Sequence, residues 1–387
     1  MNGHAPIPRV FTARLRERWP RWGRSLLVAL VLALPLSACG EVYYYWQAGL
    51  GQWEVLSRRR PVESVLADTQ VPPETRRKLA LVLKAQAFAT QELGLPQKGH
   101  YRFYTDLDRP QVSWLVVATP ALSLREHTFC YLIVGCLGYR GYFLREDADA
   151  MAAELTAQGL DVLVRPVRAY STLGWFDDPV LNTFLQGPDV DVVGTVIHEL
   201  AHRRYFLSGD TAFNESYATF VEEAGLERFL HRTAEIGGAS PVTALERWRA
   251  LQADEERFQT LVARTVERLE ALYASDTTEE VKRREKTALF TKFREDYQSA
   301  RGSFTLSNYE GWFAQALNNA HLVGMGHYTR YVRAFKALFA EQGGQFEPFY
   351  RAVEALGALP EAERRTRLAQ LEMQGAKHPP NPLTRNP

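Results

Sequence analysis

The sequence predicts an α+β fold, with a small N-terminal sheet followed by a predominantly helical second half. Two observations predict it. Short runs of aromatic and β-branched residues, bounded by glycine, proline or polar residues, recur between residues 101 and 167, as they do in strands. After residue 190 the apolar residues recur every three or four positions, which is typical of one buried face of a helix.

The first half should contain three helices and a set of short strands. Helices are expected over Tyr43–Leu66, Glu74–Glu92 and Ala148–Gln158, and strands over Tyr101–Tyr104, Trp114–Ala118, Phe129–Val134, Tyr139–Phe143 and Val162–Val167. Pro72-Pro73 before the second helix and Gly94 after it are start and stop signals. Pro166 has no backbone N–H to donate, which suits an edge strand.

The second half is expected to be helical. Residues 241–300 carry apolar residues at helical spacing among many charges, and Asp276-Thr277-Thr278 begins a new helix, so an antiparallel helical pair is predicted with its charges on the solvated face. Aromatic residues return over 304–338. The expected organisation is a leader over 1–38, a region with the sheet and the first helices of the second half over 39–235, a further helical region over 236–376, and a disordered tail over 377–387.

Residues 198–202 read His-Glu-Leu-Ala-His within a helical stretch. Residues four apart lie on one helix face, so His198 and His202 can offer two imidazole nitrogens to one metal ion. Glu199 lies beside them, where it can take a proton from a metal-bound water. The alternative is an ordinary helix with two surface histidines. The apolar residues around the motif favour the metal site, because they give the helix a buried side.

A third ligand is expected from Glu215, at the head of a second helix that begins twelve residues after His202. The turn residues 208–210 allow this helix to return against the first. Two histidines and one glutamate leave a fourth zinc position open for water, as in catalytic sites. Glu222 lies seven residues beyond Glu215, on roughly the same face. It either orients a zinc ligand or is a surface acid.

These motifs resemble known metallopeptidases. Residues 198–202 followed by 214–219 look like the gluzincin signature of aminopeptidase N-type enzymes, with a shorter connection between the two parts. A closer resemblance, carried by residues 134–143, 169–181, the zinc region through Glu223 and residues 317–320, is to a bacterial family of predicted aminopeptidase lipoproteins. The resemblance implies a membrane-anchored zinc aminopeptidase. A sheet that precedes the active-site helix is also the order of elements expected of a zincin-like metallopeptidase.

The proposed chemistry needs a general base and a donor to the developing oxyanion. Glu199 is the expected base. Many gluzincins take the donor from a Tyr or His after the ligand helix, and Tyr328 is the first candidate here. The other candidates are Tyr309, Tyr331, His321 and His327. Each of these residues could instead be a packed aromatic or a surface histidine.

Three functions are compatible with the sequence: a zinc aminopeptidase that removes N-terminal residues from peptides, a zinc endopeptidase of the cell envelope, and a non-catalytic peptide-binding lipoprotein. Glu199 argues against the last, because a scaffold does not need a general base. An aminopeptidase also needs carboxylates for the free amino group, and the candidates are Asp177, Asp178, Asp210, Glu222 and Glu223. A strand over Val167–Gly174 is a candidate for the cleft edge to which a peptide adds, or else a loop.

The N-terminus indicates export. Six arginines precede residue 25, an apolar run covers residues 26–34, and Leu36-Ser37-Ala38-Cys39 follows. This is the pattern of a secretory signal, and its last four residues look like a bacterial lipobox. Cys39 is therefore the expected site of lipid attachment and the first residue of the mature chain. With Gly40 after it, resemblance places the protein at the outer membrane, facing the periplasm.

The composition fits an exported globular enzyme. Without the leader, 46 − 6 = 40 basic residues face 45 − 1 = 44 acidic residues, so no nucleic-acid partner is indicated. The oligomeric state is not indicated. Cys130 and Cys136 would be about 20 Å apart in one continuous strand, and a bridge between them would require a turn near Val134-Gly135. Two free, buried thiols are therefore expected.

Overall fold

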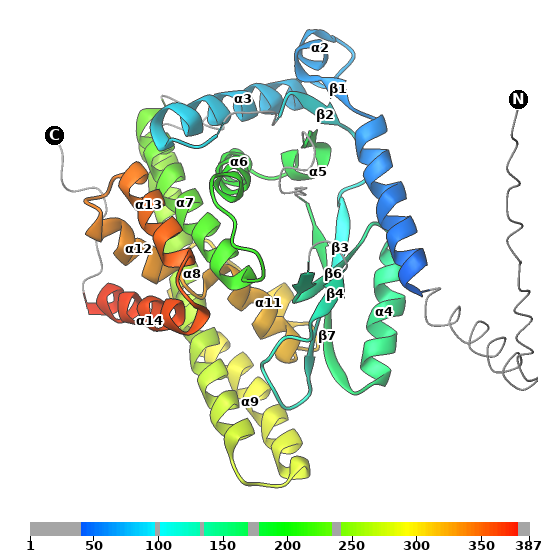
Figure 1. The fold of residues 1–387 in the computed structure, drawn as a ribbon, viewed down its shortest axis with the longest axis vertical. Helices are drawn as coiled ribbons and strands as arrows, with labels where there is room; N and C mark the ends of the chain where they lie inside the picture. Colours follow the sequence, from blue (N-terminus) through cyan, green and yellow to red (C-terminus); the bar gives the residue numbers. More distant parts are fainter. Residues whose placement is uncertain (1–39, 97–100, 132–134, 169–177, 234–240, 378–387) are drawn as a thin grey trace, which may run out of the picture. The chain divides into compact units, whose positions relative to one another are not determined.

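The computed structural model describes residues 40–96, 101–131, 135–168, 178–233 and 241–377 (Figure 1). Nothing is described of the side chains of residues 241–242, 326–329 and 376–377. The chain divides into two compact units, Met1–Leu50 and Gly51–Pro387. The expected signal peptide and Cys39 lie outside the described residues, as does the tail beyond Lys377. No helix in the described ranges is long and apolar enough to cross a membrane.

A helix covers residues 40–57. The elements that follow in the first half are β1 (Arg60–Pro61), α2 (Val62–Ala67), α3 (Pro73–Leu93), β2 (Phe103–Thr105), β3 (Ser113–Pro120), β4 (Phe129–Tyr131), β5 (Gly135–Leu137), β6 (Tyr139–Tyr142), α4 (Arg145–Ala157), β7 (Leu160–Val167), β8 (Val180–Leu181) and α5 (Asn182–Leu185). The helices and strands expected between residues 74 and 167 are thus confirmed to within a few residues, except that the second half of the strand expected over Phe129–Val134, residues 132–134, lies outside the described residues.

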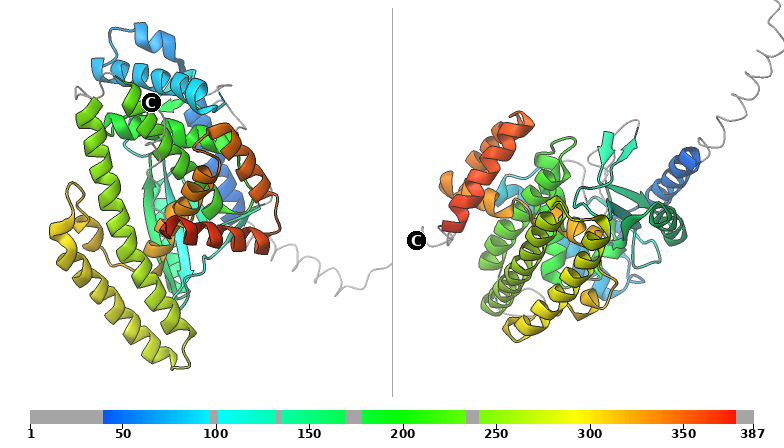
Figure 2. Two further views of the ribbon diagram at one scale, coloured as in Figure 1. Left: turned by 90° about the vertical axis from the view of Figure 1, so that its left-hand side faces the viewer. Right: turned by 90° about the horizontal axis from the view of Figure 1, so that it is seen from below.

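The second half is helical, as expected. Its elements are α6 (Asp189–Arg204), α7 (Thr211–Arg232), α8 (Pro241–Ala274), α9 (Glu279–Ala300), the 3-10 turn η1 (Arg301–Ser303), α10 (Glu310–Phe313), α11 (Asn319–Thr329), α12 (Val332–Glu341), α13 (Phe346–Gly357) and α14 (Glu361–Lys377). The predicted helical pair is α8 and α9, which lie side by side in Figure 2. Thr278 caps α9, because its hydroxyl accepts a hydrogen bond from the backbone N–H of Val281.

The single helix expected over Tyr43–Leu66 is wrong in its second half. Helical structure stops at residue 57, and Arg60–Pro61 pairs with β2 before α2 begins. Proline disfavours the helical conformation of the residue before it and cannot donate its own backbone hydrogen bond. Pro61 therefore keeps Arg60–Pro61 out of a continuous helix and directly precedes α2. The apolar spacing of the segment gave no indication of this interruption.

The described strands form three small sheets. In the central sheet the strand order is β6-β3-β7, all antiparallel, with α4 on one face and α11 on the other (Figure 1). Among the described strands β7 pairs only with β3, so Pro166 does lie in an edge strand. A second sheet, β1-β2-β8, joins segments from residues 60 to 181, and its β2–β8 pair is parallel.

Cys130 and Cys136 form a disulfide, so the expectation of two free, buried thiols is wrong. The two residues are directly opposite each other in the antiparallel pair β4–β5, with Cα atoms 3.9 Å apart, and both are exposed. The chain reverses between them instead of continuing as one strand, and Gly135 has the left-handed φ of 77° that favours glycine. A bridge between these two cysteines was expected to require a turn near Val134-Gly135, and the reversal of the chain meets that requirement.

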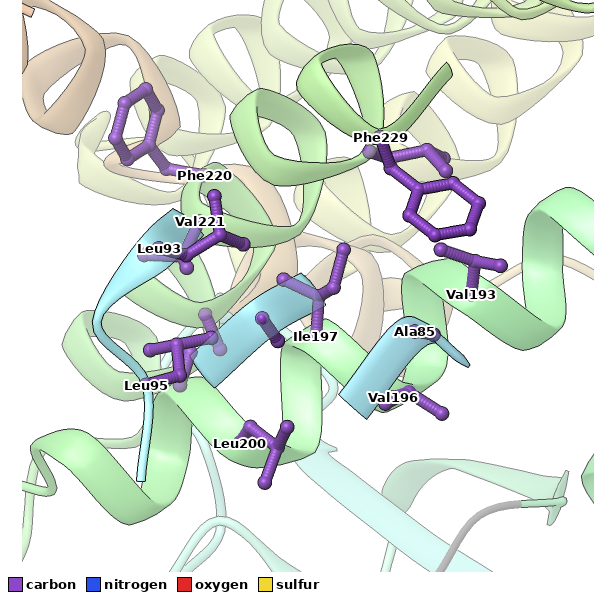
Figure 3. Close-up of a cluster of buried hydrophobic side chains, with 14 of the residues drawn as sticks. Ala85, Leu93, Leu95, Val193, Val196, Ile197, Leu200, Phe220, Val221 and Phe229 are labelled. Atoms are coloured by element: carbon purple, nitrogen blue, oxygen red, sulfur yellow. The ribbon is translucent and has the colours of Figure 1, made fainter. Parts of the chain in front are cut away.

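The hydrophobic core surrounds α6, the helix of the His-Glu-Leu-Ala-His motif. Val193, Val196, Ile197 and Leu200 on α6 are at most 1% exposed. Figure 3 shows them between side chains of α3 and the segment after it and side chains of α7. Each fully buried side chain of this size contributes about 1.5–3 kcal/mol to folding. This face fixes the rotation of α6, and with it the direction of the polar residues on its other face.

Candidate metal centre

α6 presents His198 and His202 one turn apart on one face, as the motif predicts. Their ring centroids are 4.8 Å apart. The two side chains are 12% and 7% exposed, so they are nearly removed from solvent. Neither is the surface histidine of the alternative interpretation.

α7 brings Glu215 to the histidines through a fixed connection. The helix begins at Thr211, not at Asn214 as expected, because Asp210 caps it by accepting a hydrogen bond from the N–H of Phe213 at 3.1 Å. Asn214 is 1% exposed, and its amide side chain both donates to and accepts from the backbone of Leu207, at 2.7 Å each. These bonds tie the connecting loop to α7 one residue before Glu215.

Three atoms converge between α6 and α7: the Nε2 atoms of His198 and His202 and a carboxylate oxygen of Glu215. The two Nε2 atoms are 3.2 Å apart, and Glu215 Oε2 lies 3.5 Å from the first and 3.8 Å from the second. A tetrahedral zinc ion with bonds of about 2.0–2.2 Å holds its ligand atoms roughly 3.3–3.6 Å apart. The donor set therefore fits zinc in both chemistry and spacing.

Glu222 contacts the other ring nitrogen of His198, with Oε2 3.0 Å from Nδ1. A proton held on Nδ1 by this carboxylate leaves the lone pair of Nε2 directed at the three-atom cluster. Gly194 provides the space, because a Cβ at that position would stand 2.6 Å from Glu222 Oε1. Glu222 and Gly194 together orient one of the candidate ligands.

The electrostatics of the centre favour a cation. Burial lowers the pKa of His198, but contacts with Glu215 and Glu222 outweigh burial and raise the pKa well above its usual value. Burial raises the pKa of Glu215, but hydrogen bonds from the two histidines outweigh it and hold this pKa far below its usual value. Burial is the main reason that the pKa of Glu199 is raised, which makes its carboxylate a stronger base.

Tyr101 is a residue of this region that the sequence did not single out for a function. Its φ of 58° is unusual for a tyrosine, and its side chain is 4% exposed. Burial, and then the charges of Glu199 and Asp178, raise the pKa of Tyr101 well above its usual value. The phenol therefore stays protonated close to the expected base. No local pattern indicates this placement, because a backbone hydrogen bond from Tyr101 to Asp178, 3.3 Å long, joins distant segments.

The oxyanion donors expected from the segment after α9 are placed as follows. Tyr328 lies in α11, which packs against α7, but its side chain is outside the described part, as is that of His327. Tyr309 stacks on Phe258 and donates a hydrogen bond to Glu255 at 2.8 Å, in a second hydrophobic cluster. His321 contacts Asn318, and burial lowers its pKa to about 4.

The backbone of Tyr331 lies near the centre. Its N–H donates to the hydroxyl of Ser216, the residue after Glu215, at 3.1 Å. Its side chain packs against the main core. The candidate cleft strand over Val167–Gly174 lies mostly outside the described residues, and β7 ends at Val167.

The acids expected to bind a free amino group separate into different environments. Asp178 is 5% exposed and lies close enough to Glu199 for its charge to raise the pKa of that residue. Asp210 is occupied by capping α7 and by an ion pair with Arg364 at 3.1 Å. Burial raises the pKa of Glu223 to about 8, and the nearby charges include Lys336. Asp177 is outside the described residues.

Comparison with known proteins gives one match. The family described as "Putative aminopeptidase" matches residues 43–368, most of the chain. No curated protein and no solved structure matches it. The match spans the histidine pair, Glu215 and Glu222 together with the helices that follow them.

Proposed function

Since this chain belongs to the family described as "Putative aminopeptidase", we propose that it is a zinc-dependent aminopeptidase of gluzincin type with a zincin-like fold. The observation that carries the proposal is the convergence of His198, His202 and Glu215 at the spacing of tetrahedral zinc ligands. Its substrates are peptides with a free N-terminus.

Each residue of the centre has a task in hydrolysis. Zinc bound by the three ligands supplies Lewis-acid chemistry toward water and the scissile carbonyl. Glu199 takes a proton from the attacking water and passes it to the leaving amine. Glu222 keeps the imidazole of His198 in its orientation. Tyr101, a protonated phenol near Glu199, donates a hydrogen bond to the oxygen that becomes negative, and Tyr328 is the second candidate for that task.

Asp178 is the proposed anchor for the substrate amino group. It is buried, and among the four candidate acids in the described part of the chain it is the one whose charge is among the main influences on the pKa values of both Glu199 and Tyr101. A carboxylate at that place pairs with an ammonium group and sets the distance from the N-terminus to the cleaved bond. That distance distinguishes removal of single residues from internal cutting.

The proposed location is the periplasmic face of a bacterial membrane. Cys39 receives the lipid, and the basic, apolar and small-residue segments before it direct export. Acyl chains contribute about 0.8 kcal/mol for each buried methylene, so several chains anchor a protein stably.

The test is metal analysis of the mature chain together with digestion of a mixed peptide library. We expect about one zinc per chain and stepwise loss of single N-terminal residues. Glu199→Gln should keep the zinc and lose hydrolysis by roughly two to four powers of ten, because Glu199 is the base and not a ligand. Near-normal turnover in this variant would refute the mechanism.

Two further arms separate the alternatives. Peptides with an acetylated N-terminus should resist the enzyme if Asp178 binds an ammonium group, and Asp178→Asn should raise KM for free peptides more than it lowers kcat. Internal cutting of acetylated peptides at an equal rate would indicate an endopeptidase. Zinc-dependent peptide binding without hydrolysis would indicate a scaffold.

A further inference from the structure

Exposed apolar side chains are concentrated on the helix over residues 40–57. Six of the ten large hydrophobic side chains that are exposed in the described part of the chain lie between Val42 and Trp53. Val42, Trp46 and Leu50 are 66%, 64% and 51% exposed. We call these three residues the apolar face. Such a concentration is unusual on a surface that meets only water.

The spacing of these residues gives the helix one apolar side. Val42, Trp46 and Leu50 are four residues apart, so they lie within an arc of about 80° on a helix of 3.6 residues per turn. Trp53 follows three residues later in the same helix and is 69% exposed. From Val42 to Trp53 the chain has no Asp, Glu, Lys or Arg. A charge-free stretch with an exposed apolar side is typical of a surface that is covered in the working protein.

The length and chemistry of the stretch fit the surface of a bilayer. Twelve helical residues extend about 18 Å, well short of the roughly 30 Å hydrocarbon core, so the segment cannot span a membrane. Tryptophan and tyrosine are enriched where headgroups meet acyl chains, because their rings are apolar and carry one polar group. The exposed residues here include Trp46 and Trp53, with Tyr43 and Tyr45 beside them.

The position of this stretch in the chain indicates what covers its apolar side. Val42 is three residues after Cys39, the proposed site of lipid attachment. A lipid at Cys39 would hold the first turn of the helix within a few ångströms of the headgroups. We propose that the apolar face lies in the headgroup region of a lipid bilayer, with the helix parallel to the membrane surface. The proposal uses the proposed lipid site only for this position and does not depend on the metal centre.

The binding test uses the leaderless mature chain with Cys39→Ser, which has no acyl chains, and vesicles of phosphatidylethanolamine and phosphatidylglycerol. We expect it to co-sediment with the vesicles. The combined change Val42→Ser, Trp46→Ser and Leu50→Ser should weaken vesicle binding by roughly tenfold or more. The matched control changes three other exposed hydrophobic residues, Leu144→Ser, Leu306→Ser and Met373→Ser. It should bind like the parent.

A second arm uses the full chain in cell membranes. The cysteine introduced by Trp46→Cys should be protected from a water-soluble maleimide until detergent is added. The cysteine introduced by Leu306→Cys should react both with and without detergent. Equal vesicle binding by the parent and the triple variant would overturn the proposal. It would also be overturned if the triple change dissociated an oligomer while vesicle binding stayed the same, because the face would then bind a second copy. Zinc content and peptide hydrolysis, measured on the same samples, report on the proposed enzyme separately.

Discussion

The two sides of the candidate centre are held in place in different ways. On the ligand side, α6 and α7 pack very closely, and a Cβ at Gly225 would stand 3.1 Å from Ile197 Cγ2 and 2.6 Å from Leu93 Cδ1. Around the expected base Glu199, Tyr101 and Asp178 come from distant segments and are joined by a backbone hydrogen bond. Tyr101 is held there in a backbone conformation that costs on the order of 1 kcal/mol or more.

This difference separates two properties of the centre. The ligands belong to two helices whose spacing is set by a packed core, so metal affinity should depend on α6 and α7. The charge of Asp178 acts on Glu199 and that of Glu199 acts on Tyr101, and neither Asp178 nor Tyr101 is among the three converging groups of the described residues. Changes on their side should therefore alter turnover and leave the metal in place.

The largest effect is expected from removing two ligands together. In His198→Ala with His202→Ala, only Glu215 remains of the three converging groups. Zinc content should fall from about one per chain to near zero, and hydrolysis should fall to background. Metal analysis after gel filtration checks this. His231→Ala, an exposed histidine in the last turn of α7, is the matched control and should keep both. Stoichiometric zinc in the double variant would rule out the site.

Tyr101→Phe tests the proposed oxyanion donor, which is not a candidate ligand. It removes the hydroxyl and keeps the ring, so zinc content should be unchanged while kcat falls by roughly 10²–10³, as for loss of one oxyanion donor. KM should change little, because the donor acts on charge that develops in the transition state. Steady-state kinetics on one peptide measure this. A kcat equal to that of the parent would transfer the task to Tyr328.

Gly194→Ala tests the orientation of a ligand without touching it. The added Cβ would stand 2.6 Å from Glu222 Oε1, so the carboxylate must move away from His198. Loss of such a supporting contact typically costs 10- to 100-fold in metal affinity. Competition with a zinc chelator measures it. Gly311→Ala, whose Cβ would meet no atom within 4 Å, is the control and should leave affinity unchanged. Equal affinities in both variants would mean that Glu222 does not orient His198.

The convergence of His198, His202 and Glu215 could be predicted from the sequence because the information for it is local. Four-residue spacing on one helix places His198 and His202 together wherever that helix packs, and a turn suffices to bring Glu215 back to them. The start of α7 was predicted too late, at Asn214 next to Glu215, because Asp210 caps the helix and lets it begin at Thr211. The apolar spacing around Pro61 gave no indication of the interruption there.

The other side could not be predicted because its contacts join distant segments. Tyr101 occurs in an aromatic run that predicts a strand. Its backbone N–H instead donates to Asp178, and the charge of Glu199 acts on its phenol, although both residues are far from it in the sequence. The cysteines gave a similar problem. Their separation as one strand excludes a bridge, and the hairpin that permits it is a matter of pairing between β4 and β5.

The smallest effect is expected at Glu223, which is adjacent to Glu222 on α7. Glu222 contacts His198, whereas Glu223 is not among the converging groups. Burial raises the pKa of Glu223 to about 8, Lys336 lowers it, and Glu222, Glu255 and Glu256 raise it further. Glu223→Gln should therefore leave zinc content unchanged and alter the pH dependence of stability. Glu222→Gln should weaken zinc binding, because it removes the carboxylate that contacts His198 Nδ1.

The sign follows from the two pKa values of Glu223. Its carboxyl group titrates near 4.5 in the unfolded chain and near 8 in the folded one, so the folded state holds a proton that the unfolded state releases. The contribution of Glu223 to the free energy of unfolding is therefore fully present below pH 4.5 and is lost as pH rises toward 8. Glutamine cannot ionise, so Glu223→Gln should be more stable than the parent by about 3 kcal/mol at pH 7 and about 1 kcal/mol at pH 5.5. Urea unfolding of both zinc-loaded chains at several pH values measures the difference. A gap that stays constant from pH 5.5 to 8 would show that Glu223 is ionised in the folded protein.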